Sequence, residues 1–222
     1  MIPLRDTERS YSTPWVTMLI VAVNAAVFLF ELSLGPWSRN HLIATYGLVP
    51  ARLHLVSFLT SMFLHGGWLH IVGNMWFLWI FGDNVEDVLG HLQYLVFYLL
   101  CGFAAAATQI ALSPGSWVPT IGASGAIAGV MGAYLVKFWH SRIVTLVFVF
   151  VFFTTVELPA AIFLVYWFIL QLFNGAGSLE SAHASAGGVA WFAHVGGFIA
   201  GIVLIKILPT HRPYQRRPEL YW

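Results

Sequence analysis

Apolar stretches long enough to cross a bilayer recur along this chain, and they limit its fold more than any other feature. A helix needs about 20 apolar residues to span the hydrocarbon core. Hydrophobic residues make up 59% of the 222 residues and charged residues only 9%, whereas a soluble domain carries about 25% charged residues. The composition therefore predicts a polytopic membrane protein and excludes an ordinary soluble enzyme or a nucleic-acid-binding protein. Five stretches have about the required length: residues 15–34, 58–81, 92–112, 121–139 and 187–208.

A sixth span is predicted from a longer apolar region, residues 143–173, which Glu157 and Pro159 interrupt. Proline removes a backbone donor and glutamate is costly in lipid, so the region is divided there. Residues 158–173 are expected to form a short span. Residues 143–156 are rich in β-branched and aromatic residues, which favours an extended or interfacial segment. The expected fold is an all-α polytopic membrane protein with six transmembrane helices.

The basic residues indicate the orientation, because cytoplasmic loops carry an excess of Lys and Arg. With the N-terminus inside, only Arg39 and Arg52 fall on the outer side. We therefore expect a short cytoplasmic N-terminus (1–14), a membrane domain (15–208) and a basic cytoplasmic tail (209–222), in the cell (inner) membrane. The first span is expected to be a retained helix and not a signal peptide. The residues at or near the inner side are Arg5, Arg9, Lys137, Arg142, Lys206, Arg212, Arg216 and Arg217.

Two connections are unusual. Residues 35–57 form a long outer loop, and loops of this length tend to be functional or to pack as units. Residues 174–186 are rich in Gly, Ala and Ser, which fits either a mobile flap or a plain linker. Cys101 is expected to fill a gap in an apolar interior.

Polar residues inside the predicted spans are candidates for function, because they are costly in lipid. His70 and Asn74 are four residues apart and share a helix face, whereas His65 is turned away from both on an ideal helix. The pair can act on one target, or it can simply bind a neighbouring helix. His194 is the fourth such residue, and Ser124 is added because of its surroundings.

Ser124 lies in the sequence Gly122-Ala123-Ser124-Gly125 at the start of the fourth predicted span. A helix N-terminus presents unpaired N–H groups that can stabilise a developing oxyanion. Gly125 and Gly129 also begin a stripe of small residues, and such stripes often indicate only close helix packing.

His194 stands at the head of a second stripe, formed by Gly197 and Gly201. The fourth and sixth spans run in the same direction, so packing stripe against stripe brings Ser124 and His194 together. His70 lies about 18 Å along a helix that starts at residue 58. It reaches Ser124 only if the fourth helix starts below the membrane surface or the second begins above it. The geometry predicts a water-filled pocket open to the outside.

Three motifs together resemble those of the rhomboid family of intramembrane serine proteases, over roughly residues 15–208. The motifs are His65-Gly66-Gly67-Trp68-Leu69-His70-Ile71-Val72-Gly73-Asn74, Gly122-Ala123-Ser124-Gly125, and Ala193-His194-Val195-Gly196-Gly197 with Gly201.

The resemblance implies a six-helix bundle in which Ser124 is the nucleophile and His194 the general base and acid. It also implies that His70, Asn74 and the Ser124 backbone N–H donate to the oxyanion, and that His65 is structural. Where relatives often carry an aromatic ring against the histidine, this chain has Ala128, so support is expected from Trp191 or from a ring on another helix. The implied substrates are transmembrane helices of other proteins, cleaved near the outer face.

Other functions are less compatible with these residues. The main alternative is a catalytically weak or inactive relative that binds membrane clients. A transporter would need an ionisable relay that continues to the inner side. A metalloprotease is disfavoured because His65 and His70 are five apart with no H-E-x-x-H motif, so no metal and no other cofactor are expected. An aspartyl protease is disfavoured because its candidate carboxylates are explained by a solvated helix end: Asp83, Glu86 and Asp87.

Overall fold

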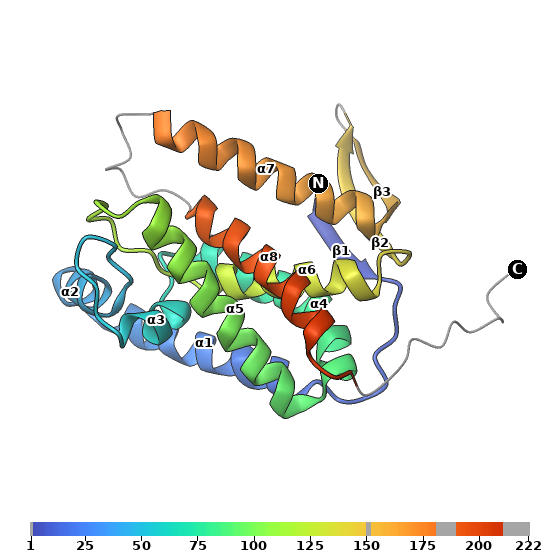
Figure 1. Cartoon of the computed structure of the whole chain (residues 1–222), viewed down its shortest axis with the longest axis horizontal. Helices are drawn as coiled ribbons and strands as arrows, with labels where there is room; N and C mark the ends of the chain where they lie inside the picture. The colour runs from blue at the N-terminus through green and yellow to red at the C-terminus, as the bar shows by residue number, and fades with distance from the viewer. Residues whose placement is uncertain (1, 150–151, 181–189, 211–222) are drawn as a thin grey trace, which may run out of the picture.

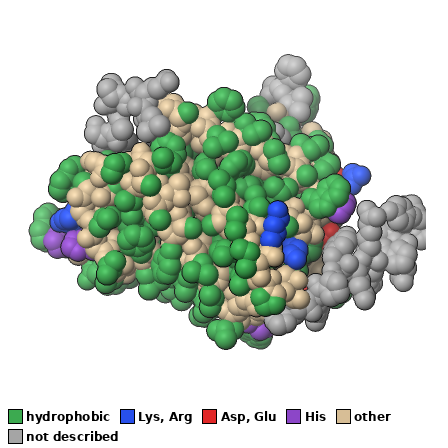
Figure 2. All heavy atoms as spheres, viewed as in Figure 1, with side chains coloured by type: hydrophobic (Ala, Val, Ile, Leu, Met, Phe, Trp, Pro, Cys, Tyr) green, Lys and Arg blue, Asp and Glu red, His purple; other side chains and the backbone are tan. Residues whose placement is uncertain are grey.

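The computed structural model describes residues 2–149, 152–180 and 190–210, and these contain a bundle of six longer helices (Figure 1). The helices α1, α5 and residues Ala160–Gly177 of α7 are long and apolar enough to cross a membrane, and α6 and α8 are shorter apolar helices. Hydrophobic side chains are spread over the whole face shown in Figure 2, and few charged side chains are seen on it. The predicted polytopic helical bundle is confirmed. Its members are α1 (Trp15–Ser33), α4 (Trp68–Leu89), α5 (His91–Leu112), α6 (Ser124–Lys137), α7 (Ala160–Glu180) and α8 (Trp191–Ile207).

The central helix is α6, which lies between α4, α5 and α8, while α7 and α1 run along opposite edges of the bundle (Figure 1). Its small residues let α8 approach backbone to backbone. A Cβ atom added at Gly197 would collide with the carbonyl oxygen of Gly125, and one at Gly201 with that of Gly129. The contacts advance in the same direction along both helices, so α6 and α8 are parallel and their first turns lie side by side.

The second predicted span is not one helix from residue 58, and this prediction is wrong. A short helix α3 (Ser57–Thr60) and a 3-10 turn (Ser61–Phe63) come first, and α4 begins only at Trp68. Leu64 is extended, and Gly66 and Gly67 follow it. Paired glycines disfavour helix because they lose the most backbone entropy there. The helix then continues to Leu89, beyond the predicted end at residue 81.

The helix α7 also differs from its prediction, because it begins after Pro159 and continues to Glu180. Residues 174–180 are therefore helical, although they were predicted to belong to a connecting segment. The rest of that segment, 181–186, lies outside the described residues. So do residues 211–222, which hold most of the predicted basic tail.

A three-stranded antiparallel sheet stands at one end of the bundle, beside the start of α7 (Figure 1). Its strands are β1 (Ile2–Asp6), β2 (Arg142–Val149) and β3 (Phe152–Pro159), in the order β1-β2-β3. The extended interpretation of residues 143–156 is confirmed. The strand β1 was not predicted. Hydrogen bonds tie it to the bundle: Trp76 Nε1 donates to Pro3 O (2.6 Å), and Asn84 Nδ2 (2.9 Å) and Tyr134 Oη (2.6 Å) donate to Asp6 Oδ2.

The long connection between α1 and α3 is an ordered segment. It contains a helix that the sequence did not predict, α2 (Pro36–Tyr46), and then a bridge in which Leu48 pairs with Thr120. Leu48 and Val49 are buried. This bridge fixes the segment that leads into α6 and therefore the position of the first turn of α6.

Glu86 is not a solvated residue at a helix end, so that interpretation is wrong for this carboxylate. Its side chain is fully buried and accepts hydrogen bonds from Val16 N (2.8 Å), Thr17 N (2.8 Å) and Thr17 Oγ1 (2.7 Å). The two N–H groups belong to the first turn of α1, where they have no partner within the helix and where a negative charge is also favoured by the helix dipole. Glu86 therefore joins the start of α1 to α4.

Candidate active site

Ser124 and His194 meet where the parallel helices α6 and α8 begin. Ser124 is the first residue of α6, His194 lies in the first turn of α8, and Ser124 Oγ is 2.8 Å from His194 Nε2. Ser124 is half-buried, whereas His194 is buried with 8% of its surface exposed. The glycine contacts between the two helices bring a hydroxyl and an imidazole within hydrogen-bond distance, an arrangement that can activate a serine nucleophile.

The second ring nitrogen of His194 has a partner that the sequence reasoning missed. His194 Nδ1 lies 2.7 Å from Oε1 of Gln171, a buried residue of α7. The available signal was a single amide side chain in an otherwise apolar predicted span, residues 158–173.

Aromatic rings flank His194 although Ala128 offers none. The ring centroid of Trp167 is 5.7 Å from that of His194, and the ring of Trp191 stands edge-on at 6.1 Å. Trp191 and a ring on another helix were the two expected supports. Both are present, because Trp167 lies on α7, one turn before Gln171, and it is the closer of the two.

The imidazole of His70 is oriented so that its Nε2 faces Gly122. The backbone N–H of Gly66 donates to His70 Nδ1 (3.3 Å), so a neutral His70 carries its proton on Nε2. Gly122 has φ +118°, and a Cβ atom there would lie 2.6 Å from His70 Nε2 and 3.4 Å from Asn74 Nδ2. Only glycine tolerates both this backbone conformation and this close approach. The donor groups of His70 and Asn74 therefore face the residue two positions before Ser124.

His65 is not turned away from His70 and Asn74, because it lies in the break before α4 and not on a helix. Its Nε2 is 3.0 Å from Asn74 Nδ2, and its Nδ1 is 3.2 Å from the carbonyl oxygen of Phe63. The carbonyl requires a donor, so His65 Nδ1 carries the proton and Nε2 accepts one from Asn74. His65 thus orients the amide of Asn74.

The backbone of His65 is itself held by two charged residues from other elements. Its N–H donates to Glu31 Oε1 of α1 (3.0 Å), and its carbonyl accepts from Arg39 of α2 (3.0 Å). Glu31 and Arg39 are also paired, with Nε and Oε2 at 3.6 Å.

The break before α4 also explains how His70 and Ser124 can lie at the same depth along the bundle. Because α4 starts at Trp68, His70 lies in the first turn of its helix, as Ser124 does in α6. The second helix begins later than predicted, so its early residues need not descend 18 Å to reach Ser124.

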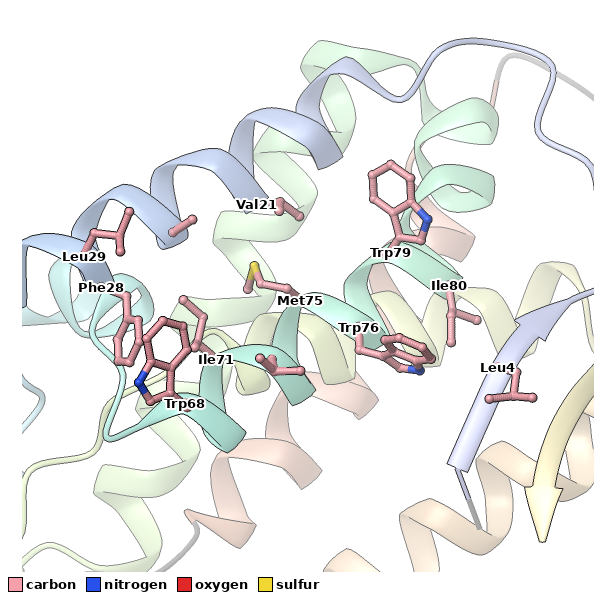
Figure 3. A pocket seen from close by; sticks show the side chains of 12 residues that line it. Leu4, Val21, Phe28, Leu29, Trp68, Ile71, Met75, Trp76, Trp79 and Ile80 are labelled. Atoms are coloured by element: carbon pink, nitrogen blue, oxygen red, sulfur yellow. The ribbon is translucent and has the colours of Figure 1, made fainter. Parts of the chain in front are cut away.

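An apolar groove with a volume of about 550 Å³ lies elsewhere, between α1 and α4 (Figure 3). Phe28, Trp68, Met75 and Trp79 are among its lining residues, and no residue of the Ser124 and His194 pair is. A groove of this composition suits apolar contact and not hydrolysis. In the described parts of the chain, no three His, Cys, Asp or Glu side chains are grouped to hold a metal ion.

Comparison with known proteins gives the family. Residues 52–210, more than half of the chain, match the model of the rhomboid domain. The chain belongs to the rhomboid family. The match includes all three motifs around Ser124, His194 and the pair His70 and Asn74.

Some curated relatives of this rhomboid are named rhomboid-like proteins, and one relative is named a rhomboid protease. Rhomboid-like protein 11, chloroplastic, of Arabidopsis thaliana is 28% identical over 204 residues, which cover 83% of this chain and 65% of the relative. Presenilin-associated rhomboid-like protein, mitochondrial, of Bos taurus is 32% identical over 127 residues (56% and 33%). Rhomboid protease GluP of Bacillus subtilis (strain 168) is 33% identical over 127 residues (55% and 24%). The chain thus spans between about a quarter and two thirds of the length of these relatives, of which one is named a protease.

Proposed function

We propose that this rhomboid is an intramembrane serine endopeptidase that cleaves transmembrane segments of other membrane proteins near the outer face. The observation that carries the proposal is the 2.8 Å contact between Ser124 Oγ and His194 Nε2. A serine hydroxyl is a weak nucleophile until an adjacent base takes its proton, and histidine is the usual base near neutral pH.

The reaction follows from the groups around that contact. Ser124 Oγ attacks the scissile carbonyl carbon while its proton moves to His194 Nε2, and the carbonyl oxygen becomes an oxyanion. The N–H groups of His70 Nε2, Asn74 Nδ2 and the Ser124 backbone are its proposed donors. His194 then gives the proton to the leaving amine as the peptide bond breaks. Water, activated by His194, hydrolyses the acyl-enzyme and restores Ser124.

The substrate class follows from the location of the pair at the ends of two membrane helices. A carbonyl inside a helix is hydrogen-bonded within that helix, so a transmembrane substrate must unwind locally before attack. We therefore expect small or helix-breaking residues near the cleaved bond. The hydrolytic water must reach Ser124, and the half-buried state of this side chain is consistent with access from one side.

We also propose an orientation of the chain in the membrane. The chain is an integral membrane protein, and we place both termini on the cytoplasmic side of the cell membrane, with residues 1–14 and 209–222 inside and the Ser124 end of α6 outside. The distribution of Lys and Arg supports this orientation. Cytoplasmic and periplasmic reporters fused after residue 222 test it, and a signal from only the periplasmic reporter contradicts it.

Cleavage of a model single-pass substrate in liposomes tests the activity. Ser124→Ala and His194→Ala are expected to abolish cleavage while the proteins keep the wild-type unfolding temperature in detergent. Ser33→Ala and His54→Ala change an exposed serine and an exposed histidine away from the site and are the matched controls. Substantial cleavage by either site variant contradicts the proposal. Substrate capture without cleavage by the wild type favours the alternative, a rhomboid relative that only binds membrane clients.

A further inference from the structure

Gln171 is a buried polar residue on the apolar helix α7, with 5% of its surface exposed, and its amide meets the imidazole of His194 on the side opposite Ser124. We propose that Gln171 is a positioning residue that fixes the proton of neutral His194 on Nδ1 and so leaves Nε2 free to accept the proton of Ser124. This inference rests on the proposed function and adds a third residue to the pair.

The orientation of the Gln171 amide is fixed by a neighbour that can only accept. Gln171 Nε2 lies 3.1 Å from the backbone carbonyl oxygen of Trp167, one turn earlier on α7. The opposite orientation would place two acceptor oxygens against each other. The amide N–H therefore points to Trp167, and Oε1 is the atom that faces His194.

The tautomer of His194 follows from this orientation. Gln171 Oε1 has no proton to give, so the 2.7 Å contact requires that His194 Nδ1 donates. A neutral imidazole carries one proton, and its other nitrogen is then an acceptor. That nitrogen is Nε2, which is 2.8 Å from Ser124 Oγ, so the serine hydroxyl donates to it. The chain of bonds runs in one direction from Ser124 to the carbonyl of Trp167.

The same contact serves the charged state of His194. After His194 takes the serine proton, both ring nitrogens carry protons and Nδ1 still donates to Gln171 Oε1. A hydrogen bond from a charged donor is stronger than a neutral one. An amide cannot remove the proton, so His194 keeps it for the leaving amine. In triads the orienting carboxylate performs this tautomer selection, and the wrong tautomer is costly for turnover.

A purely structural role is the competing interpretation, because the contact also ties α7 to α8. Gln109 on α5 provides a matched control. Its Oε1 accepts from the backbone N–H of Ala193 (3.2 Å), so Gln109 also connects a neighbouring helix to the first turn of α8. Unlike the bond of Gln171, this bond is to the backbone and not to the imidazole of His194. Loss of Gln109 affects packing of the same helix without affecting the ring of His194.

The kinetic test compares three variants in liposomes with the model substrate. Gln171→Met removes the acceptor at similar length and is expected to lower kcat about 10- to 100-fold with little change in KM, as loss of a buried hydrogen-bond partner does. Gln171→Glu keeps an acceptor oxygen toward Nδ1 in either protonation state and is expected to remain within about fivefold of the wild-type kcat. Gln109→Met is expected to lower the unfolding temperature with kcat within about twofold.

A spectroscopic test does not depend on activity. Solid-state ¹⁵N NMR of histidine-labelled protein in liposomes reads which ring nitrogen carries the proton, and the spectrum of His194→Ala identifies the signal of His194. The wild type and Gln171→Glu are expected to show the Nδ1–H form at neutral pH, and Gln171→Met a mixture of both forms. If the wild type neither cleaves substrate nor reacts as a serine hydrolase, the proposed function fails, and this spectrum still decides the role of Gln171.

Three results would overturn the inference: a wild-type kcat in Gln171→Met, an equal loss of kcat in Gln171→Met and Gln109→Met, or an Nε2–H form of His194 in the wild-type spectrum.

Discussion

Backbone groups that can only donate or only accept a hydrogen bond determine which ring nitrogen carries the proton in the histidines near Ser124. The N–H of Gly66 makes Nδ1 of His70 an acceptor, and the carbonyl of Phe63 makes Nδ1 of His65 a donor. His70 therefore presents Nε2–H toward Gly122, while His65 accepts from Asn74. At this scale the proposed oxyanion donors are already oriented before a substrate is present.

The change of His70 or Asn74 to Ala is expected to lower kcat by about 10²- to 10³-fold for each, because an oxyanion donor acts on the transition state. KM is expected to change little. Steady-state cleavage with several substrate concentrations measures both constants, and Val72→Ala, an exposed change on the same helix, is the control. A rise in KM with an unchanged kcat contradicts the oxyanion assignment.

Sequence reasoning placed the motif residues near one another but missed how they are oriented. The spacing of His70 and Asn74 is a helical one, so their shared face could be predicted. The contact of His65 with Asn74 could not, because it depends on a break in the chain that an ideal helix does not contain. Gln171 was missed because an amide in an apolar run carries no charge and belongs to no motif.

At the scale of elements, the parallel contact between α6 and α8 sets the distance between Ser124 and His194. Gly197 touches the carbonyl oxygen of Gly125, and Gly201 that of Gly129, so neither glycine has room for a methyl group. A methyl group can enter only if the helices separate. The distance between Ser124 and His194 is thus linked to packing three and seven residues away from His194.

We expect Gly197→Ala to lower the unfolding temperature in detergent and to lower kcat, because it pushes α8 away from Ser124. Overpacking a tight interior typically costs about 1–3 kcal/mol. Gly73→Ala on α4 is the matched control, since a Cβ atom there meets nothing within 4 Å. Its unfolding temperature should equal or exceed that of the wild type. Equal stability of the two variants would show that the close approach of α6 and α8 is not needed.

The number and approximate place of the six longer helices followed from apolar length, but their ends did not. One helical segment ends at Phe63 and α4 starts only at Trp68, directly after Gly66 and Gly67, although the apolar run continues through this break. In α7 the reverse happens, since small residues after 173 remain helical. Local composition decides such ends only together with tertiary partners, as the bond of the His65 N–H to Glu31 illustrates.

At the scale of the whole molecule, the N-terminal strand and the bundle are joined through a half-buried carboxyl group. The pKa of Asp6 is raised to about 7, chiefly because the group is desolvated and also because the carboxylates of Asp83 and Glu8 are near, while the hydrogen bond from Tyr134 lowers it. The folded protein therefore keeps a proton on Asp6 that the unfolded chain releases above its ordinary pKa of 3.8. Stability from this group is full below pH 3.8 and declines as the pH rises toward about 7.

The variant Asp6→Asn is expected to flatten this decline, because an amide oxygen can still accept from Tyr134 and Asn84 and carries no charge. Unfolding temperatures in detergent between about pH 5 and 8 measure it. Glu8→Gln is the comparison, since burial also raises the pKa of Glu8 but no fixed hydrogen bond joins it to Tyr134. An unchanged slope in Asp6→Asn contradicts the role given to this carboxyl group.

The central claim is that Ser124 is a nucleophile activated by His194, and reaction with a fluorophosphonate probe measures this most directly. Such a probe bonds covalently to an activated serine, and peptide mapping identifies the serine without knowledge of any substrate. The account predicts that wild-type protein in liposomes is labelled on Ser124 and that labelling is lost in Ser124→Ala and in His194→Ala. Wild-type protein that stays unlabelled, or labelling that persists in His194→Ala, would contradict it.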